Sequence, residues 1–242
     1  MTPDWRGATA ARIALTRSGA ALATAPMLQL RLAHALARDA VHAVLDEAAL
    51  AATLPTPALR AWSEAPDRAT YLMRPDLGRR LHAEAAAALA PHAAPYELVI
   101  TLGDGLSAQA LQRHAAPLLD RLLPSLKRWR LAPLVLVRNA RVATSDAIGK
   151  TLGAAAVLAL IGERPGLSAP DSLGAYLTWD PEPGITTDAN RNCISNIRPD
   201  GLDYEDAAHR LHHLLHAMRE SRTSGVTLKD ESFAPAKLPG AS

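Results

Sequence analysis

The sequence predicts an α/β protein in which a helical N-terminal region precedes a Rossmann-like domain with a mainly parallel sheet. Short apolar runs at 97–102, 133–137 and 155–161 alternate with segments of helical periodicity. This alternation is typical of a parallel sheet with right-handed crossovers. Before these runs, residues 26–45 place apolar side chains three or four positions apart, as one face of a helix requires. The order of the two patterns along the chain predicts the order of the two regions.

Residues 1–92 are expected to form the helical region. Its first helix has an apolar face made of Leu28, Leu32, Ala35, Leu36, Ala40 and Val44. A short helix is expected over 47–54 and a longer one over 75–89, with Pro75 near the first turn, where proline is tolerated. The helical pattern is interrupted by Pro55, Pro57, Pro66, Pro91 and Pro95. We therefore expect a domain boundary near 91–96.

The Rossmann-like domain is expected over 93–230, and a loose tail rich in proline and alanine over 231–242. The expected strands of this domain span 97–102, 133–137, 155–161 and 173–179. Its expected helices span 107–126, 145–152 and 204–221.

Polar residues and prolines predict where these helices begin and bend. Ser107 is predicted to cap the first helix, and Ser145 or Asp146 the second, because such side chains accept hydrogen bonds from free backbone N–H groups. Pro117 and Pro124 are expected to kink or interrupt the first helix, since proline lacks the N–H that a helix interior needs.

Composition excludes several classes of protein. With 242 residues, 48% of them apolar, the chain can bury a sizeable core and is not disordered as a whole. A formal net charge of +2 without a basic run gives no sign of nucleic-acid binding, and no apolar run approaches the ~18 residues that span a membrane. The single cysteine excludes an internal disulfide framework, and residues 1–12 lack the apolar stretch of a secretory signal. We expect a cytoplasmic protein that binds neither nucleic acid nor membrane.

A glycine-containing turn follows the first expected strand of the domain, at 103–107. Its backbone N–H groups are candidates to hold an anion or a carboxamide, and a plain tight turn is the alternative. The G-x-G-x-x-G pattern of dinucleotide-binding proteins is incomplete, because Ala108 stands at the third glycine position. Arg138 and Asn139 end the second strand, where a nicotinamide dinucleotide site would place an acid. These departures argue against a dinucleotide enzyme.

Two further polar segments attract attention. Glu163 and Arg164 follow an apolar strand directly, either as ligand contacts at the sheet edge or as members of a structural salt bridge. Cys193 lies between polar residues, and a small buried apolar role is the alternative to a functional one. As a nucleophile Cys193 would need a histidine base, and the nearby sequence offers none. We do not expect a nucleophilic cysteine.

Four histidines lie on the last expected helix. His209, His212, His213 and His216 are spaced so that several share one helical face, as zinc-binding pairs do. No carboxylate or cysteine completes such a site, and the neighbouring leucines define the buried side of the helix. We expect an exposed histidine-bearing helix rather than a metal site.

Five segments in register carry a family resemblance. They are Tyr-Leu-Met-Arg-Pro-Asp-Leu-Gly-Arg-Arg-Leu at 71–81, Asp-Gly-Leu-Ser-Ala at 104–108, Gly-Glu-Arg-Pro-Gly-Leu at 162–167, Asn-Cys-Ile-Ser-Asn-Ile at 192–197 and Ser-Gly-Val at 224–226. In this order they closely resemble the light (small) subunit of ethanolamine ammonia-lyase, an adenosylcobalamin-dependent enzyme. The resemblance runs from about residue 9 to residue 230.

The resemblance implies an accessory role in radical catalysis that converts ethanolamine to acetaldehyde and ammonia. In that family the heavy subunit is a TIM barrel that carries the catalytic side chains, so none is expected here. The light subunit covers the barrel mouth, with its N-terminal region against the heavy subunit, and contacts the corrinoid. The implied cobalamin contacts in this chain are Val142, Glu163 and Cys193. Because the D-x-H-x-x-G pattern of base-off proteins is absent, we expect base-on adenosylcobalamin.

The expected partners are therefore the heavy subunit and cobalamin. The alternative is a self-sufficient nucleotide-binding Rossmann-like enzyme, which the lack of an acid at the second strand end disfavours. Members of the family that associate with bacterial microcompartments often carry a longer N-terminal extension than the one before Ala11. We expect a cytoplasmic location, with the microcompartment as the alternative.

Overall fold

The computed structural model describes residues 12–13 and 15–232. Its helices are α1 (Thr24–His42), α2 (Glu47–Thr53), α3 (Arg68–Met73), α4 (Ala83–Leu89), α5 (Ala108–Leu122), α6 (Thr144–Leu152) and α7 (Tyr204–Ser221). Its strands are β1 (Arg17–Ser18), β2 (Ala21–Leu22), β3 (Ala58–Trp62), β4 (Leu98–Gly103), β5 (Leu134–Arg138), β6 (Ala156–Gly162), β7 (Leu173–Trp179) and β8 (Arg191–Ile197). Short 3₁₀ helices are η2 (Leu77–Arg79), η3 (Ala90–His92), η4 (Leu123–Leu126), η5 (Asp188–Asn190) and η6 (Gly225–Thr227).

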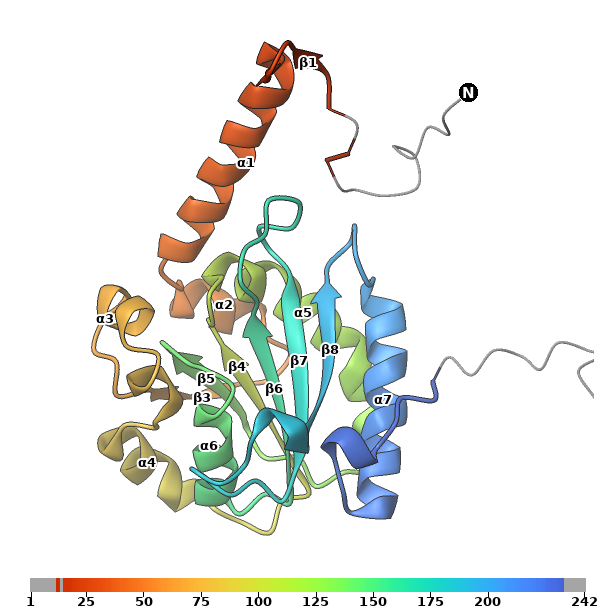
Figure 1. The fold of residues 1–242 in the computed structure, drawn as a ribbon. Helices are drawn as coiled ribbons and strands as arrows, with labels where there is room; N and C mark the ends of the chain where they lie inside the picture. Colours follow the sequence, from red (N-terminus) through yellow and green to blue (C-terminus); the bar gives the residue numbers. More distant parts are fainter. Residues whose placement is uncertain (1–11, 14, 233–242) are drawn as a thin grey trace, which may run out of the picture.

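Six strands form one sheet in the order β3-β5-β4-β6-β7-β8 (Figure 1). The first four are parallel to their neighbours, whereas β7 and β8 are antiparallel. From β4 the chain crosses through α5 to β5 on one side, and then through α6 to β6 on the other side. This reversal is the point at which open α/β sheets place their ligand crevice. The predicted α/β class with a mainly parallel sheet is confirmed.

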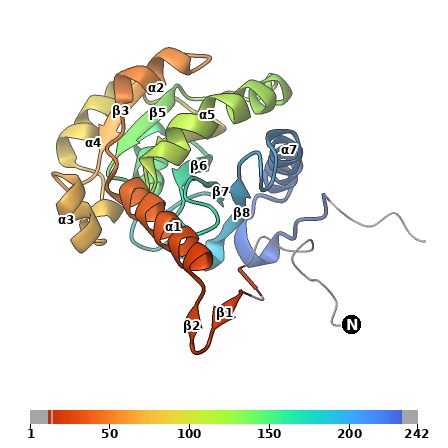
Figure 2. The ribbon, with the colours of Figure 1, turned by 90° about the horizontal axis from the view of Figure 1, so that it is seen from above.

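Helices cover both faces of the sheet (Figures 1 and 2). Leu98, Ile100 and Leu102 of β4 pack into the core formed with α5 and α7. Val99 points to the opposite face and packs into the core formed with α4 and α6. This alternation is why the central strands are apolar throughout: a strand covered on both faces has no solvent side.

The four predicted strands and the predicted helices 47–54, 145–152 and 204–221 are confirmed within one residue. Helices 26–45 and 107–126 are confirmed but end three and four residues earlier. Strand β7 runs antiparallel to its neighbours. Residues 163–172 connect β6 to β7 without a helix, and so short a connection cannot return the chain to a parallel start. As a result β7 pairs antiparallel with β6. The two strands form a hairpin.

The predictions at helix ends were only partly right. Ser107 caps α5 as predicted, by accepting a hydrogen bond from the Ala110 amide at 3.2 Å. The predicted capping of α6 by Ser145 or Asp146 is wrong, because the helix begins one residue earlier and both side chains are bound elsewhere. Pro117 does not interrupt α5, whose following leucines are fully buried, whereas Pro124 lies in η4 after the helix has ended.

The helix predicted over 75–89 is broken into η2 and α4. Leu81 forms an antiparallel bridge with Ser63, and the amide of His82 donates to the carbonyl of Trp62 at 3.0 Å. These contacts with a distant segment hold residues 80–82 extended. The helix can therefore start only at Ala83.

The region predicted to be helical also contributes a strand. Residues 58–62, between two prolines, form β3, which pairs in parallel with all five residues of β5 at the edge of the sheet. Neither β3 nor α3 was predicted, and 191–197 was not recognised as strand β8. Of the tail predicted to be loose, residues 233–242 lie outside the described part of the chain.

Helix α1 is confirmed, but most of its predicted apolar face is exposed and only Ala40 of that face is buried. Leu28, Leu32 and Leu36 are 58%, 61% and 50% exposed, and Ala33 and Ala40 are the buried positions of the helix. The helix projects from the body beyond the carboxyl ends of β4 and β6 (Figure 1). Near its middle it borders the loop after β6, with Leu32, Leu36 and Leu167 lining one small cavity.

A buried ion pair ties α6 to β8. The guanidinium of Arg191 donates to both carboxylate oxygens of Asp146 at 2.7 and 2.6 Å, and to the Thr178 hydroxyl at 2.8 Å. The two side chains are 4% and 1% exposed. Because both charges are removed from water, each depends on the other for solvation.

We expect Asp146→Ala to lower the free energy of unfolding by about 3–5 kcal/mol, because it leaves the Arg191 charge buried without a partner. The matched control is Lys150→Ala on the same helix, whose ion pair with Glu182 is half exposed and should change stability by about 1 kcal/mol or less. Urea unfolding followed by circular dichroism measures both. Equal losses in the two variants would contradict a special role for the buried pair.

Candidate functional site

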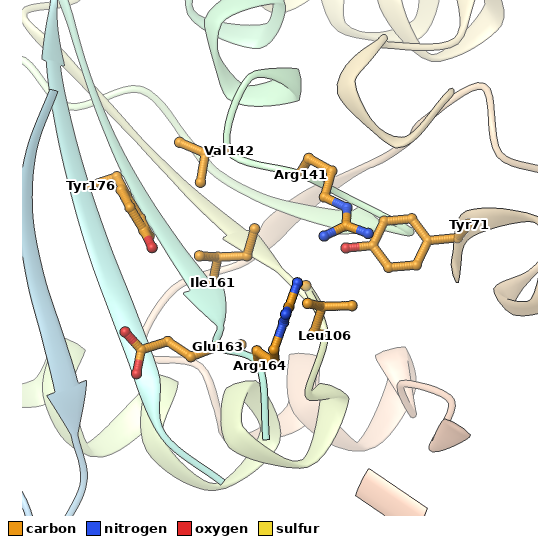
Figure 3. A pocket seen from close by; sticks show the side chains of 10 residues that line it. Tyr71, Leu106, Arg141, Val142, Ile161, Glu163, Arg164 and Tyr176 are labelled. Atoms are coloured by element: carbon orange, nitrogen blue, oxygen red, sulfur yellow. The ribbon is translucent and has the colours of Figure 1, made fainter. Parts of the chain in front are cut away.

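A pocket of about 410 Å³ lies at the carboxyl ends of β4, β5 and β6 (Figure 3). The loops after these three strands form its walls, together with side chains from α3 and β7. We call it the strand-end pocket; its side chains include Tyr71, Leu106, Arg141, Val142, Glu163 and Tyr176. It occupies the switch point of the sheet, where the crossovers on either side of β4 diverge.

Two glycines bring the backbone of neighbouring loops together at the floor of the pocket. Gly105 has a φ of +53°, and a Cβ there would lie 2.1 Å from the carbonyl oxygen of Gly162. A Cβ on Gly162 would in turn lie 2.0 Å from the carbonyl oxygen of Ser107. The amide of Leu106 donates to the Gly162 carbonyl at 2.9 Å. Only glycine allows this approach, which joins the β4 loop to the end of β6.

The turn at 103–107 is not built to hold an anion. The amide of Leu106 is bonded to Gly162, and the amide of Ser107 donates to the carbonyl of Asp104 at 3.2 Å. Because these N–H groups are already used within the fold, the anion-binding hypothesis is wrong for them and the alternative of a tight turn is right. The turn contributes backbone shape to the pocket.

Asp104 connects the loops after β4 and β5 beneath the floor of the strand-end pocket. Its side chain is 3% exposed, accepts a hydrogen bond from the Ala140 amide at 3.0 Å and lies 3.5 Å from Nη1 of Arg68. The same nitrogen of Arg68 donates to the Gly105 carbonyl at 2.6 Å. Burial raises the pKa of Asp104, and the hydrogen bonds and the guanidinium oppose that rise. With its partners satisfied inside the fold, Asp104 has a structural role.

Tyr71 forms the wall on the side of α3. It is fully buried, and its hydroxyl donates to the Ala140 carbonyl at 2.9 Å. Burial raises the pKa of the Tyr71 phenol, so it stays protonated at neutral pH and cannot act as a base. The guanidinium carbon of Arg141 lies 4.6 Å from the centre of its ring.

The structure brings Val142 and Glu163 to the same pocket. Oε2 of Glu163 accepts a hydrogen bond from the Asn196 amide at 3.1 Å, and Oε1 has no donor among the described residues. The structural salt bridge considered for Glu163 and Arg164 is absent from the described part of the chain. The backbone amide of Asn196, and not a cationic side chain, donates to the Glu163 carboxylate. The side chain of Arg164 is exposed. One carboxylate oxygen is thus free to accept a hydrogen bond.

Cys193 lies beside the pocket, behind Tyr176. The two residues are direct partners across β7 and β8, and their side chains are hydrogen-bonded. The interpretation of Cys193 as a buried apolar side chain is wrong, because the residue is exposed. Partial burial of the sulfur is the main cause that raises the thiol pKa; the hydrogen bond with Tyr176 opposes the rise, and the charge of Glu163 adds to it. The thiol therefore stays protonated at neutral pH and is a weak nucleophile.

A second cavity, of about 770 Å³, adjoins the strand-end pocket and shares Arg141, Val142 and Tyr176 with it. We call it the side cavity; it continues along α6 to the loop before η5, where Thr186 and Thr187 line it. The shared residues stand at the junction of the two spaces. The two cavities can therefore receive one extended ligand.

Three wall residues were missed in the sequence. Tyr71 and Tyr176 could not be assigned to a site because their positions depend on distant contacts. Arg141 carried a usable signal, since it lies in the loop three residues after the end of β5 and next to Val142.

The predicted exposure of the histidines on α7 is right only for His209, because His212, His213 and His216 are partly buried on a helix that packs into the core. Leu211, Leu214 and Leu215 of α7 are buried as predicted. The ring centres of His212 and His216 lie 4.3 Å apart. Within residues 12–13 and 15–232, no group of three or more histidine, cysteine or acidic side chains is arranged to hold a metal ion. In the same residues, no helix is long and apolar enough to cross a membrane.

Comparison with known proteins identifies the family. The family model described as ethanolamine ammonia-lyase light chain matches residues 2–229. A protein of Azotobacter vinelandii named ethanolamine ammonia-lyase small subunit is 54% identical, over 98% of this chain and 90% of its own length. Proteins of the same name from Xanthomonas campestris pv. campestris and Pseudomonas syringae pv. tomato are 51% and 50% identical; each match covers 95% of this chain, and 88% and 83% of the two relatives. The chain belongs to the ethanolamine ammonia-lyase light chain family.

Proposed function

We propose that this chain is the light subunit of an ethanolamine ammonia-lyase and that its strand-end pocket and side cavity receive part of adenosylcobalamin, base-on. The observation that carries the proposal is the convergence of Val142, Glu163 and Tyr176 on one pocket, with Cys193 paired to Tyr176 beside it. Val142 and Glu163 follow the ends of β5 and β6, whereas Tyr176 and Cys193 lie within β7 and β8. Their convergence is what a cofactor contact needs.

The groups present match the chemistry of cobalamin. The rim of the corrin ring carries carboxamides, whose N–H groups need acceptors, and Oε1 of Glu163 is an acceptor without a donor of its own. Val142 offers an apolar surface to a ring edge. The Gly105–Gly162 contact draws the two loops together, and Leu106 and Ile161 beside it add apolar surface that a ring can pack on.

The residues of this pocket support a binding role rather than a catalytic one. The phenols of Tyr71 and Tyr176 and the thiol of Cys193 all have raised pKa values and remain protonated at neutral pH. None can serve as a general base there. Bound adenosylcobalamin supplies the radical chemistry, while this chain binds and orients the cofactor and shields one side of it from water. The catalytic side chains would come from the heavy subunit.

Helix α1 supports an obligate partner. Its exposed leucines, Leu28, Leu32 and Leu36, form a continuous apolar stripe on a helix that stands away from the body. Such stripes mark surfaces that another chain covers. We assign this stripe, within the N-terminal region 1–92, to the heavy subunit. The proposed location of the assembly is the cytoplasm.

The alternative function, a self-sufficient nucleotide-binding enzyme, requires an acidic side chain at the end of β5 to bind a ribose. Asn139, directly after β5, is buried and donates its side-chain amide to the Ala65 carbonyl at 3.0 Å. It therefore cannot bind a ribose hydroxyl, and no acid stands beside it in the sequence.

We expect the purified chain to release no ammonia from ethanolamine, because its pocket holds no acid–base pair. Activity should appear when the heavy subunit and adenosylcobalamin are added together. An ammonia assay on the isolated chain, the isolated heavy subunit and the mixture tests this. Ammonia release by the light chain alone would contradict the proposal.

Glu163→Gln should weaken cobalamin binding by the assembled complex about ten- to a hundredfold, because a charge-assisted acceptor contributes roughly 1.5–3 kcal/mol. The amide oxygen of glutamine can still accept from Asn196, so the fold and the assembly should persist. Equilibrium dialysis with cyanocobalamin measures the affinity, and Glu205→Gln on the exposed start of α7 is the control. Equal affinity in both variants would assign Glu163 a structural role only.

Cys193→Ala should keep most of the turnover and weaken cobalamin binding only modestly, because a small neutral contact is lost. Cys193→Trp should abolish binding by filling the space beside Tyr176. Cobalamin should also protect the thiol of the assembled wild-type complex from alkylation. Equal labelling rates with and without cobalamin, together with full affinity in the alanine variant, would place Cys193 outside the site.

A further inference from the structure

We propose that Arg141 binds the phosphodiester of the nucleotide tail of cobalamin. This inference rests on the proposed function and adds to it a residue and the ligand group that the residue contacts. Arg141 stands where the strand-end pocket and the side cavity meet. A ligand that extends from one space into the other must pass it.

Arg141 lacks an acidic partner. No described carboxylate forms an ion pair with it, and its Nε is buried without a hydrogen-bond acceptor. Leaving a buried guanidinium N–H unpaired costs free energy that an incoming acceptor would recover. Two neighbouring arginines differ: Arg68 lies 3.5 Å from Asp104, and Arg80 lies 3.1 Å from Glu64. Arg141 is thus a cation at the junction of the two cavities without an anionic partner among the described residues.

The side chain is held in place before any ligand arrives. Its guanidinium lies over the ring of Tyr71, with 4.6 Å between the guanidinium carbon and the ring centre (Figure 3). Its backbone amide donates to the Gly78 carbonyl at 2.8 Å. A Cβ on Gly78 would lie 2.7 Å from the Tyr71 ring and 3.2 Å from Cγ of Arg141, so glycine is what lets the three residues pack. An arginine fixed in this way loses little conformational entropy on binding.

Cobalamin has one anionic group that could pair with the Arg141 guanidinium. The carboxamides of the corrin rim are neutral and the cobalt centre is positively charged, so the phosphodiester is the acidic group of the molecule. Arginine binds phosphate oxygens through parallel N–H donors. Arg164, the other unpaired arginine of the strand-end pocket, is exposed and has no comparable packing. The geometry therefore favours Arg141 over Arg164.

The experiment compares two corrinoids on the assembled complex of light and heavy subunits. Cobinamide keeps the corrin ring but lacks the phosphodiester and the nucleotide, whereas cyanocobalamin has both. Arg141→Met retains the stem on Tyr71 and removes the charge; Arg164→Met is the matched control, and gel filtration checks assembly. Equilibrium dialysis gives the affinity of each complex for each corrinoid.

Arg141→Met should weaken cyanocobalamin binding about ten- to a hundredfold and leave cobinamide binding unchanged. Added salt should weaken cyanocobalamin binding more in the wild type than in this variant, because the lost contact is electrostatic. Equal losses for both corrinoids, no loss for either, or a selective loss in Arg164→Met instead would overturn the assignment. Failure of the wild-type complex to bind cyanocobalamin would overturn the proposed function itself, and that outcome is distinct from the other three.

Discussion

The structure depends on one backbone contact, the approach of the Gly105 loop to the end of β6 at Gly162. The loop after β4 cannot follow its path unless both positions lack a Cβ. Through Asp104, the same loop fixes the start of the β5 loop at Ala140. Three strand ends are thus held as one rigid unit, and the side chains that they present keep a constant spacing. A pocket built in this way does not need its ligand in order to form.

Charged groups have different partners on the two sides of that floor. Behind it, Arg68 forms an ion pair with Asp104, and deeper in the fold Arg191 forms one with Asp146. In front of it, Oε1 of Glu163 and Nε of Arg141 lack partners among the described residues. Departures from full hydrogen bonding are tolerated where a protein meets its ligand. Unpartnered buried nitrogens also occur away from the pocket, for example Nη2 of Arg68 and Nε of Arg191. The groups of Glu163 and Arg141 differ from these in belonging to residues that line a cavity.

The sequence predicted those parts of the fold that depend on local pattern. The strands β4, β5 and β6 were found because, buried on both faces, they consist of apolar runs. The strand β8 was missed because several of its side chains are polar and exposed, and the break near Leu81 because it depends on a contact with Ser63. Glu163 could be singled out because it follows a strand directly, and the family resemblance then assigned it to the site, whereas the position of Tyr71 depends on packing between distant segments.

The exposed leucines of helix α1 affect the amount of this protein that persists in a cell. An unassembled copy would present Leu28, Leu32 and Leu36, each at least half exposed, on a helix that projects from the body (Figure 1). Chaperones and proteases recognise such segments, so an unpartnered copy would be removed even though its sheet is intact. The steady-state amount would then follow the supply of the partner rather than the rate of its own synthesis. Quality control would thereby keep the stoichiometry of the assembly.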